Sequence, residues 1–93
     1  MAQPTIRQLR DLVRKLDYVV STHAAEELED DDLSIFDLES IILTGRIADR
    51  QRDVHTNEIK YLVSGVTHGG RRAQTVVKIG VSRKLIVITV YVL

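Results

Sequence analysis

The sequence predicts an α+β fold in which about three short N-terminal helices pack on a four-stranded antiparallel meander sheet. Before Gly45, apolar residues recur every three or four positions between helix-capping residues. Beyond Gly45, Val, Ile, Thr and Tyr dominate, and the apolar period falls to two. The 93 residues have room for only one hydrophobic core, so residues 1–93 are expected to form a single domain.

The first two helices follow from apolar spacing and capping residues. One is expected at about residues 4–16, because proline is tolerated at a first helical position and a regular apolar stripe follows. After a short extended stretch at 18–20, Ser21 or Thr22 can cap a second helix. Three aspartates at 30–32 should end it, since Asp is a poor interior helix former.

A third helix is expected between Ser34 and Gly45. Ser34 and Asp37 have the spacing of a capping box, and glycine is a common residue just after a helix. The apolar stripe that follows the cap consists of Ile35, Leu38, Ile41 and Ile42.

The last predicted strand, LIVITVYVL, is apolar on both faces, whereas a strand covered on one face alternates. It should therefore be either central in the sheet or covered by a second chain. A homodimer through residues 85–93 would cover it, because a long apolar edge left bare invites aggregation. The four strands are expected near residues 46–52, 58–66, 72–82 and 85–92, with tight turns at 68–70 and 82–84.

The composition is that of an ordinary soluble globular protein, with 44% apolar and 28% charged residues. The absence of cysteine excludes disulfides and thiolate metal sites and suits a reducing compartment. The N-terminus lacks the apolar stretch of a signal peptide, and the apolar run at 85–93 is too short to span a membrane. We therefore expect a cytoplasmic protein with no cofactor and no membrane partner.

The net charge of zero hides a strong segregation of charge. Residues 23–40 carry eight acidic and no basic side chains, whereas residues 41–93 carry nine basic and three acidic ones. Such a distribution can create two faces of opposite potential, and a basic face can attract nucleic acid. The alternative is that the two regions neutralise each other, within the chain or between subunits.

The acidic run within the second helix does not fit a calcium loop. Started at Asp30, such a loop needs glycine and glutamate where this chain has Ile35 and Ile41. No two histidines have metal-ligand spacing either, so no metal site is expected. The run is interpreted as a solvated face or a docking surface for a basic protein partner, formed by Glu26, Glu27, Asp30, Asp31 and Asp32.

His23 stands at the start of the second helix and has two interpretations. It is either a neutral imidazole able to accept a proton, or a structural residue that packs under the sheet and bonds a backbone carbonyl. Glu26 and Glu27 follow at three and four residues, a spacing that brings side chains together on a helix and favours a charged imidazole.

Tyr91 also has two interpretations. The alternation places it on one strand face with Leu85, Val87 and Thr89. Its hydroxyl is either an acid or phosphate ligand, or simply the rim of an aromatic core residue.

Several short motifs resemble a bacterial protein family. Thr22-His23-Ala24 resembles the family's opening motif, residues 33–38 its second helix, and Ile88 to Tyr91 its closing strand. Over about residues 18–92 the chain is therefore similar to domain-of-unknown-function family 4258. The resemblance implies a RelE- or barnase-like toxin architecture, with helices ahead of an antiparallel sheet.

The resemblance also implies an activity, since proteins of that architecture are commonly RNA-cleaving toxins held inactive by an antitoxin. In such a site a base deprotonates the ribose 2′-hydroxyl, cations steady the phosphate, and a second group protonates the leaving oxygen. The residues predicted for the catalytic roles are His23, Tyr91 and Arg46.

The chain departs from the family at the positions after the histidine. Where the family typically has arginines one and two turns later, this chain has Glu27 and then Asp30 or Asp31, which would repel a phosphodiester. Cations must then come from the sheet, and the spacing of Arg46, Arg50 and Arg52 is compatible with one strand face. The predicted RNA-binding residues, which are otherwise solvated strand charges, are Arg50, Arg52, Lys60, Arg71, Arg72 and Lys78.

Two hypotheses follow. The first is a toxin-like domain of a bacterial toxin–antitoxin type system that cleaves RNA without a metal ion and has RNA and an antitoxin as partners. The second is a non-catalytic protein-binding or oligomerisation module of the same fold, acting through its acidic helix and last strand. The family likeness and the basic sheet favour the first, whereas the missing arginines and the neutral net charge favour the second.

Overall fold

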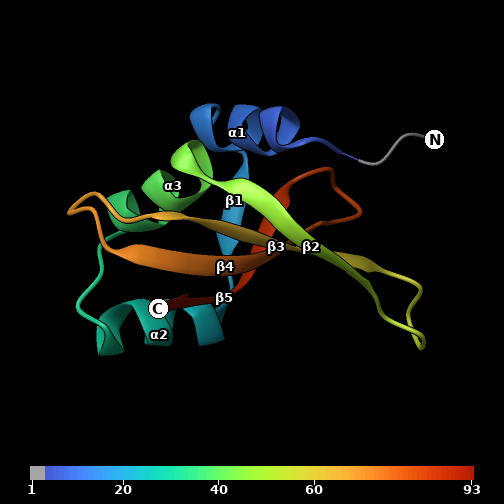
Figure 1. Cartoon of the computed structure of the whole chain (residues 1–93). Coiled ribbons are helices and arrows are strands. Elements are labelled where there is room, and N and C mark those ends of the chain that lie inside the picture. The colour runs from blue at the N-terminus through green and yellow to red at the C-terminus, as the bar shows by residue number, and fades with distance from the viewer. Residues whose placement is uncertain (1–3) are drawn as a thin grey trace.

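The computed structural model describes residues 4–93, which form three helices and one five-stranded sheet (Figure 1). The strand order is β1-β5-β4-β3-β2. The predicted α+β class is confirmed, but the prediction of a four-stranded, wholly antiparallel sheet is wrong. The helices are α1 (Ile6–Arg14), α2 (Thr22–Asp30) and α3 (Ile35–Thr44), and the strands are β1 (Tyr18–Val20), β2 (Arg46–Arg52), β3 (Ile59–Val66), β4 (Arg72–Ile79) and β5 (Leu85–Val92).

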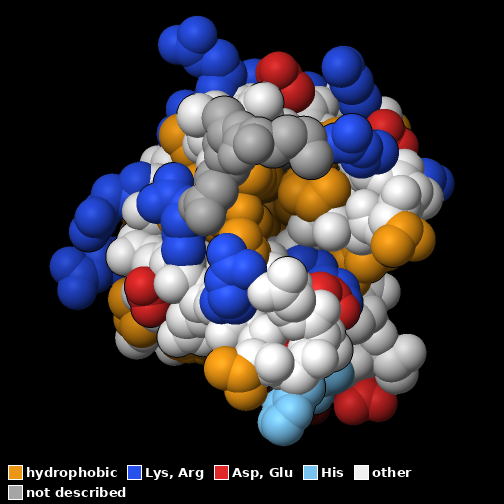
Figure 2. Space-filling model, turned by 90° about the vertical axis from the view of Figure 1, so that its right-hand side faces the viewer, with side chains coloured by type: hydrophobic (Ala, Val, Ile, Leu, Met, Phe, Trp, Pro, Cys, Tyr) orange, Lys and Arg blue, Asp and Glu red, His pale blue; other side chains and the backbone are white. Residues whose placement is uncertain are grey.

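The surface at the end where the β2–β3 hairpin projects is rich in lysine and arginine (Figure 2). Between these cations, hydrophobic side chains are visible in a hollow. Within residues 4–93, no helix is both long enough and apolar enough to cross a membrane.

The additional strand is the short extended stretch before α2. β1 pairs in parallel with β5, with Tyr18 opposite Leu85 and Val20 opposite Val87. The Tyr18 hydroxyl donates a 2.6 Å hydrogen bond to Glu39 of α3. Burial, together with this bond to a carboxylate, raises the pKa of Tyr18 to about 12. The three residues of β1 are too few for their sequence pattern to predict that the strand pairs with β5 at the other end of the chain.

Capping residues set the starts of the helices. Thr5 caps α1 in a capping box with Gln8, so this helix begins at Ile6, and the prediction that Pro4 is its first residue is wrong. The Ser21 hydroxyl accepts the Ala24 N–H at 3.0 Å and caps α2. The predicted capping box of Ser34 and Asp37 is confirmed at the start of α3.

Asp37 also fixes the β3–β4 turn to α3. Its carboxylate accepts backbone hydrogen bonds from Ser34 at 2.8 Å and from His68 at 3.0 Å. The bond from the Ser34 N–H, and to a lesser extent that from His68, lowers the pKa of Asp37 below its ordinary value of 3.8.

We expect Asp37→Asn to make the free energy of unfolding less sensitive to acid. Because the folded-state pKa of Asp37 is depressed, its carboxylate stabilises the fold fully above its ordinary pKa and progressively less as the pH falls through the folded-state value. Urea unfolding near pH 7 and near pH 3 measures this loss, which should be smaller in Asp37→Asn than in the wild type. Asp32→Asn changes an exposed carboxylate and is the control; equal acid sensitivity in all three proteins would contradict the prediction.

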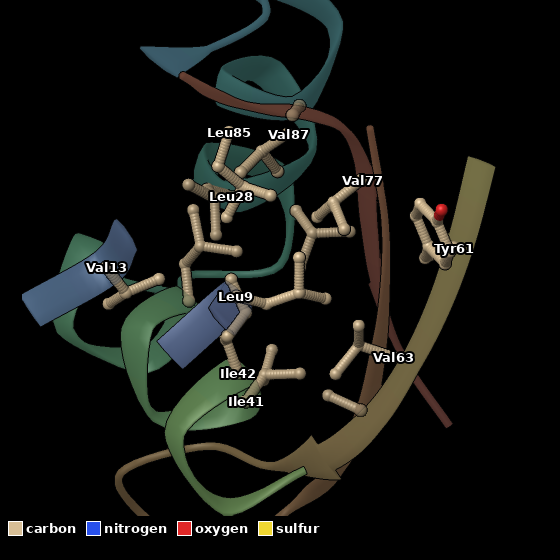
Figure 3. Close-up of a cluster of buried hydrophobic side chains, with 14 residues drawn as sticks. Leu9, Val13, Leu28, Ile41, Ile42, Tyr61, Val63, Val77, Leu85 and Val87 are labelled. Atoms are coloured by element: carbon tan, nitrogen blue, oxygen red, sulfur yellow. The ribbon is translucent and has the colours of Figure 1, made fainter. Parts of the chain in front are cut away.

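The hydrophobic core lies between the helices and one face of the sheet. α3 packs on β3 and β4, α1 packs on α3, and α2 contacts β5. Leu9 of α1, Ile41 of α3 and Val63 of β3 are buried together in this cluster (Figure 3). The prediction that the helices share one face therefore holds for α1 and α3, whereas α2 lies beside β5 (Figure 1). We call the sheet face opposite α1 and α3 the open face.

β5 has a strand on both sides over its first half. β1 pairs with its first half, and the Ser21 N–H donates to the Val87 carbonyl at 2.9 Å. Further along, Glu27 of α2 accepts the Val90 N–H at 3.0 Å and the Thr89 hydroxyl. The chain itself thus pairs part of this edge, up to the Val90 N–H. This position agrees with the central placement that the two-sided apolar pattern predicted as one option, and a homodimer through residues 85–93 stays a prediction.

An extra residue in β5 changes which side chains share a face. The register with β4 shifts between Val87 and Thr89, a β-bulge at Ile88. Val87 consequently faces the core, while Thr89 and Tyr91 lie on the open face. The prediction that Tyr91 shares a face with Leu85 and Val87 is therefore wrong.

A second bulge has the same effect in β2. The register with β3 shifts between Ile47 and Asp49. Arg46 pairs with Ser64 on the open face, whereas Arg50 and Arg52 pair with residues of the opposite face. The prediction that these three arginines share one face is wrong, because a period-two pattern does not reveal an inserted residue.

Candidate functional site

Four polar side chains form a row across the open face. Arg46, Ser64, Gln74 and Tyr91 are successive cross-strand partners on β2, β3, β4 and β5. Since adjacent strands are about 4.8 Å apart, the row is about 14 Å long. The Tyr91 hydroxyl lies 2.6 Å from Oε1 of Gln74 and donates to it, which fixes the tyrosine ring at the β5 end. Two of the three predicted catalytic residues, Arg46 and Tyr91, thus lie on one face.

A neighbouring row of cross-strand partners on the open face ends near His23, the predicted general base. Its members in the sheet are Asp49, Leu62, Val76 and Thr89. The Thr89 hydroxyl donates to Glu27 Oε1, and Nε2 of His23 lies 3.3 Å from the same oxygen. Thr89 and Tyr91 are two residues apart on one strand face, roughly 7 Å. His23 and Tyr91 therefore mark the ends of adjacent rows.

His23 is exposed, with 68% of its side chain accessible to solvent. The interpretation that it packs under the sheet is therefore wrong: it lies in the first turn of α2, on the outside of the helix. The predicted i,i+4 neighbour, Glu27, does contact it. An exposed imidazole beside a fixed carboxylate has the placement of an oriented general base.

Glu27 occupies a different environment from the rest of the acidic run. Its side chain is only 25% exposed, and its Oε1 serves Val90, Thr89 and His23 together. The interpretation of Glu27 as part of a solvated or docking surface therefore fails, because its carboxylate is already engaged within the chain. The remaining predicted acids are exposed and form no ion pair with any residue in 4–93; they are Glu26, Asp30, Asp31 and Asp32.

The predicted RNA-binding cations divide between the two faces of the sheet. Lys60, Arg72 and Lys78 lie on the open face, and Lys78 pairs with Glu58 at 2.6 Å. Arg71 is exposed in the adjoining β3–β4 turn.

The other two cations point away from this site. The Arg50 guanidinium lies over the Tyr61 ring at 6.0 Å from its centroid, on the helix side of the sheet. Arg52 donates a 2.6 Å hydrogen bond to Asn57. The open face therefore carries Tyr91, Arg46, Lys60, Arg72 and Lys78, with His23 beside its β5 edge, but neither Arg50 nor Arg52.

Ser64 and Gln74 belong to the site and are not indicated by the sequence. Each is a single polar residue at an outward position of a strand, the ordinary pattern of a half-covered sheet. Only the register shows that they connect Arg46 to Tyr91. In the described part of the chain, no three His, Asp or Glu side chains are grouped to hold a metal ion.

Comparison with known protein families finds a match to the family named Domain of unknown function (DUF4258), over residues 20–92. Comparison with curated proteins and with solved structures finds no match. The match covers most of the chain, including His23, the acidic helix and all four strands of the meander. The chain therefore belongs to the DUF4258 family.

Proposed function

We propose that this chain is a toxin-like domain of RelE- or barnase-like type that binds RNA across the open face and cleaves it without a metal ion. The observation that carries the proposal is the exposed His23, held beside Glu27 at the end of a row that adjoins Tyr91 and Arg46. An antitoxin that covers this face would be the inhibitory partner.

The proposed reaction begins at His23. In the neutral imidazole the hydrogen would stand on Nε2, which faces Glu27, so that Nδ1 is left to accept the 2′-hydroxyl proton. The 2′-oxygen then attacks the neighbouring phosphorus, and the bond to the 5′-oxygen breaks. Tyr91 would protonate this leaving oxygen, and Arg46 would stabilise the charge on the phosphate. Glu27 and Gln74 act as positioning residues for His23 and Tyr91.

The open-face cations supply the affinity for the phosphate backbone. Lys60 and Arg72 lie on the same face as the two rows, and RNA contacts of this kind weaken as salt rises. Glu27 stands where the family typically has arginine, and its charge would repel a phosphate. Because its carboxylate accepts hydrogen bonds from a backbone N–H and a hydroxyl, this repulsion of RNA should be reduced.

The exposed acids of α2 favour a second function, binding of a basic protein. Glu26, Asp30 and Asp31 form no ion pair with residues 4–93, so their charge is available to a partner. In this second case the fold would act as a non-catalytic protein-binding or oligomerisation module, and RNA would stay intact.

Induced expression in bacteria, followed by incubation of the purified protein with single-stranded RNA in EDTA, tests the first proposal. We expect the wild type to stop growth and fragment RNA, and His23→Ala to do neither, because the base is lost. His55→Ala removes an exposed histidine of the β2–β3 hairpin and should behave as the wild type. Normal growth and intact RNA in the presence of folded wild-type protein would overturn the nuclease proposal and leave the protein-binding one.

A further inference from the structure

A hollow of about 600 Å³ opens on the helix side of the sheet, away from the open face. Its apolar floor comes from α1, β3 and β4, through Leu12, Ile59, Tyr61 and Ile79. Figure 2 shows hydrophobic side chains in a hollow, with lysine and arginine side chains around it. We call this feature the α1 hollow.

Tyr61 leaves a polar group directed into the α1 hollow. The residue is only 3% exposed, and its hydroxyl has no hydrogen-bond partner within residues 4–93. Within residues 4–93, every side-chain oxygen or nitrogen that solvent cannot reach has a hydrogen-bond partner. Because the Tyr61 oxygen has none, it must be accessible to solvent, and the hollow that Tyr61 lines provides the access. A buried tyrosine normally finds a partner for its hydroxyl, and residues 4–93 supply none to Tyr61.

The rim of the hollow has an excess of positive charge. Lys15, at the end of α1, and Arg83, in the β4–β5 turn, form no ion pair within residues 4–93. The one carboxylate in the lining, Asp11, is already bound to Arg14 at 3.3 Å. Arg50 adds a third cation over the outer face of the Tyr61 ring.

Two exposed apolar residues lie close in sequence to the rim residues. Leu16 follows Lys15 and is 72% exposed, and Val81, in the same turn as Arg83, is fully exposed. Large aliphatic residues at such exposure, beside an apolar hollow, are typical of a surface that another molecule covers.

We propose that the α1 hollow is the docking site for a segment of a partner protein in which apolar side chains stand next to carboxylates. An apolar side chain would fill the floor, a polar group would bond the Tyr61 hydroxyl, and the carboxylates would meet Lys15 and Arg83. The floor is aliphatic apart from Tyr61, which favours protein over RNA, whose backbone would present phosphates to it. The proposal does not depend on RNA cleavage, since it uses the opposite side of the sheet.

Selection of a random peptide library displayed on phage, with the immobilised chain as target, tests the chemistry without knowledge of the partner. We expect enriched peptides to share large apolar residues flanked by Asp or Glu. Peptides of the enriched sequence should bind the Lys15→Glu/Arg83→Glu variant at least about tenfold more weakly than the wild type, because both rim attractions become repulsions. Tyr61→Phe, which keeps the ring, should weaken binding by a smaller factor.

The Arg7→Glu/Arg71→Glu variant is the matched control, since it makes the same change in net charge outside the hollow. It should bind the enriched peptides as the wild type does, and circular dichroism checks that both variants are folded. Absence of an acidic–apolar consensus, or equal binding by the rim variant and the wild type, would overturn the proposal. So would salt-dependent self-association of the wild type that the rim variant lacks, because the occupant would then be a second copy of this chain.

Discussion

Gly65→Ala is expected to lower the free energy of unfolding by at least about 3 kcal/mol. A Cβ atom at this position in β3 would overlap the carbonyl oxygen of Ile41 in α3 and lie 3.0 Å from Cα of Gly45. All of these are backbone atoms, so no side-chain rotation can relieve the overlap. The last turn of α3 would have to move away from β3, and Ile41 would lose its packing on Val63 in the core.

The control for this prediction is Gly69→Ala, in the β3–β4 turn. There an added Cβ would have no neighbour closer than Thr67 Oγ1 at 4.0 Å, so the free energy of unfolding should change by less than about 0.5 kcal/mol. Urea unfolding followed by circular dichroism measures both variants. Similar midpoints for Gly65→Ala and the wild type would show that α3 and β3 are not in this close contact.

Glu27→Ala is expected to lower the free energy of unfolding by about 2 kcal/mol. The substitution removes the acceptor of the Val90 N–H and of the Thr89 hydroxyl and leaves the second half of β5 without its edge partner. Glu27→Gln keeps an acceptor oxygen but loses the charge, so about half of this effect should remain. His23 would lose its carboxylate neighbour in both variants, so that both should also cleave RNA more slowly if the proposed function is correct.

Hydrogen exchange locates the effect of Glu27. In Glu27→Ala the Val90 amide should exchange faster than in the wild type, because its acceptor is gone. Glu26→Ala removes the exposed carboxylate next in sequence and should change neither stability nor exchange. If the two alanine variants behaved alike, Glu27 would have no role in closing the edge of β5.

The sequence predicted the parts of this fold that depend on local pattern. The capping box at Ser34 and Asp37, the cap at Ser21 and the strands after Gly45 follow from residue type and spacing within a few positions. Non-local features were missed. The parallel pairing of Tyr18 with Leu85 depends on residues at opposite ends of the chain.

The candidate site was only partly predictable for the same reason. His23, Arg46 and Tyr91 were predicted by residue type, but the face that Tyr91 shares with Arg46 depends on the bulge at Ile88. One inserted residue reverses the facing of everything after it, so the bulge at Ala48 that leaves Arg46 on the open face turns Arg50 away. The sequence predicted Glu27 to be one of several solvated acids, because nothing in the acidic run distinguishes it from Glu26.

The pairing of β1 with β5 has a consequence for the order of folding. α1 and α2 flank β1, whose only strand partner within residues 4–93 is β5, the last strand in chain order. Contacts between such distant segments form slowly, because a long loop must close before they gain any stability. During synthesis β1 and α2 would therefore wait for β5, so the surface that carries His23 and Tyr91 would form in a late step. A chain truncated before β5 should accordingly remain without stable tertiary structure.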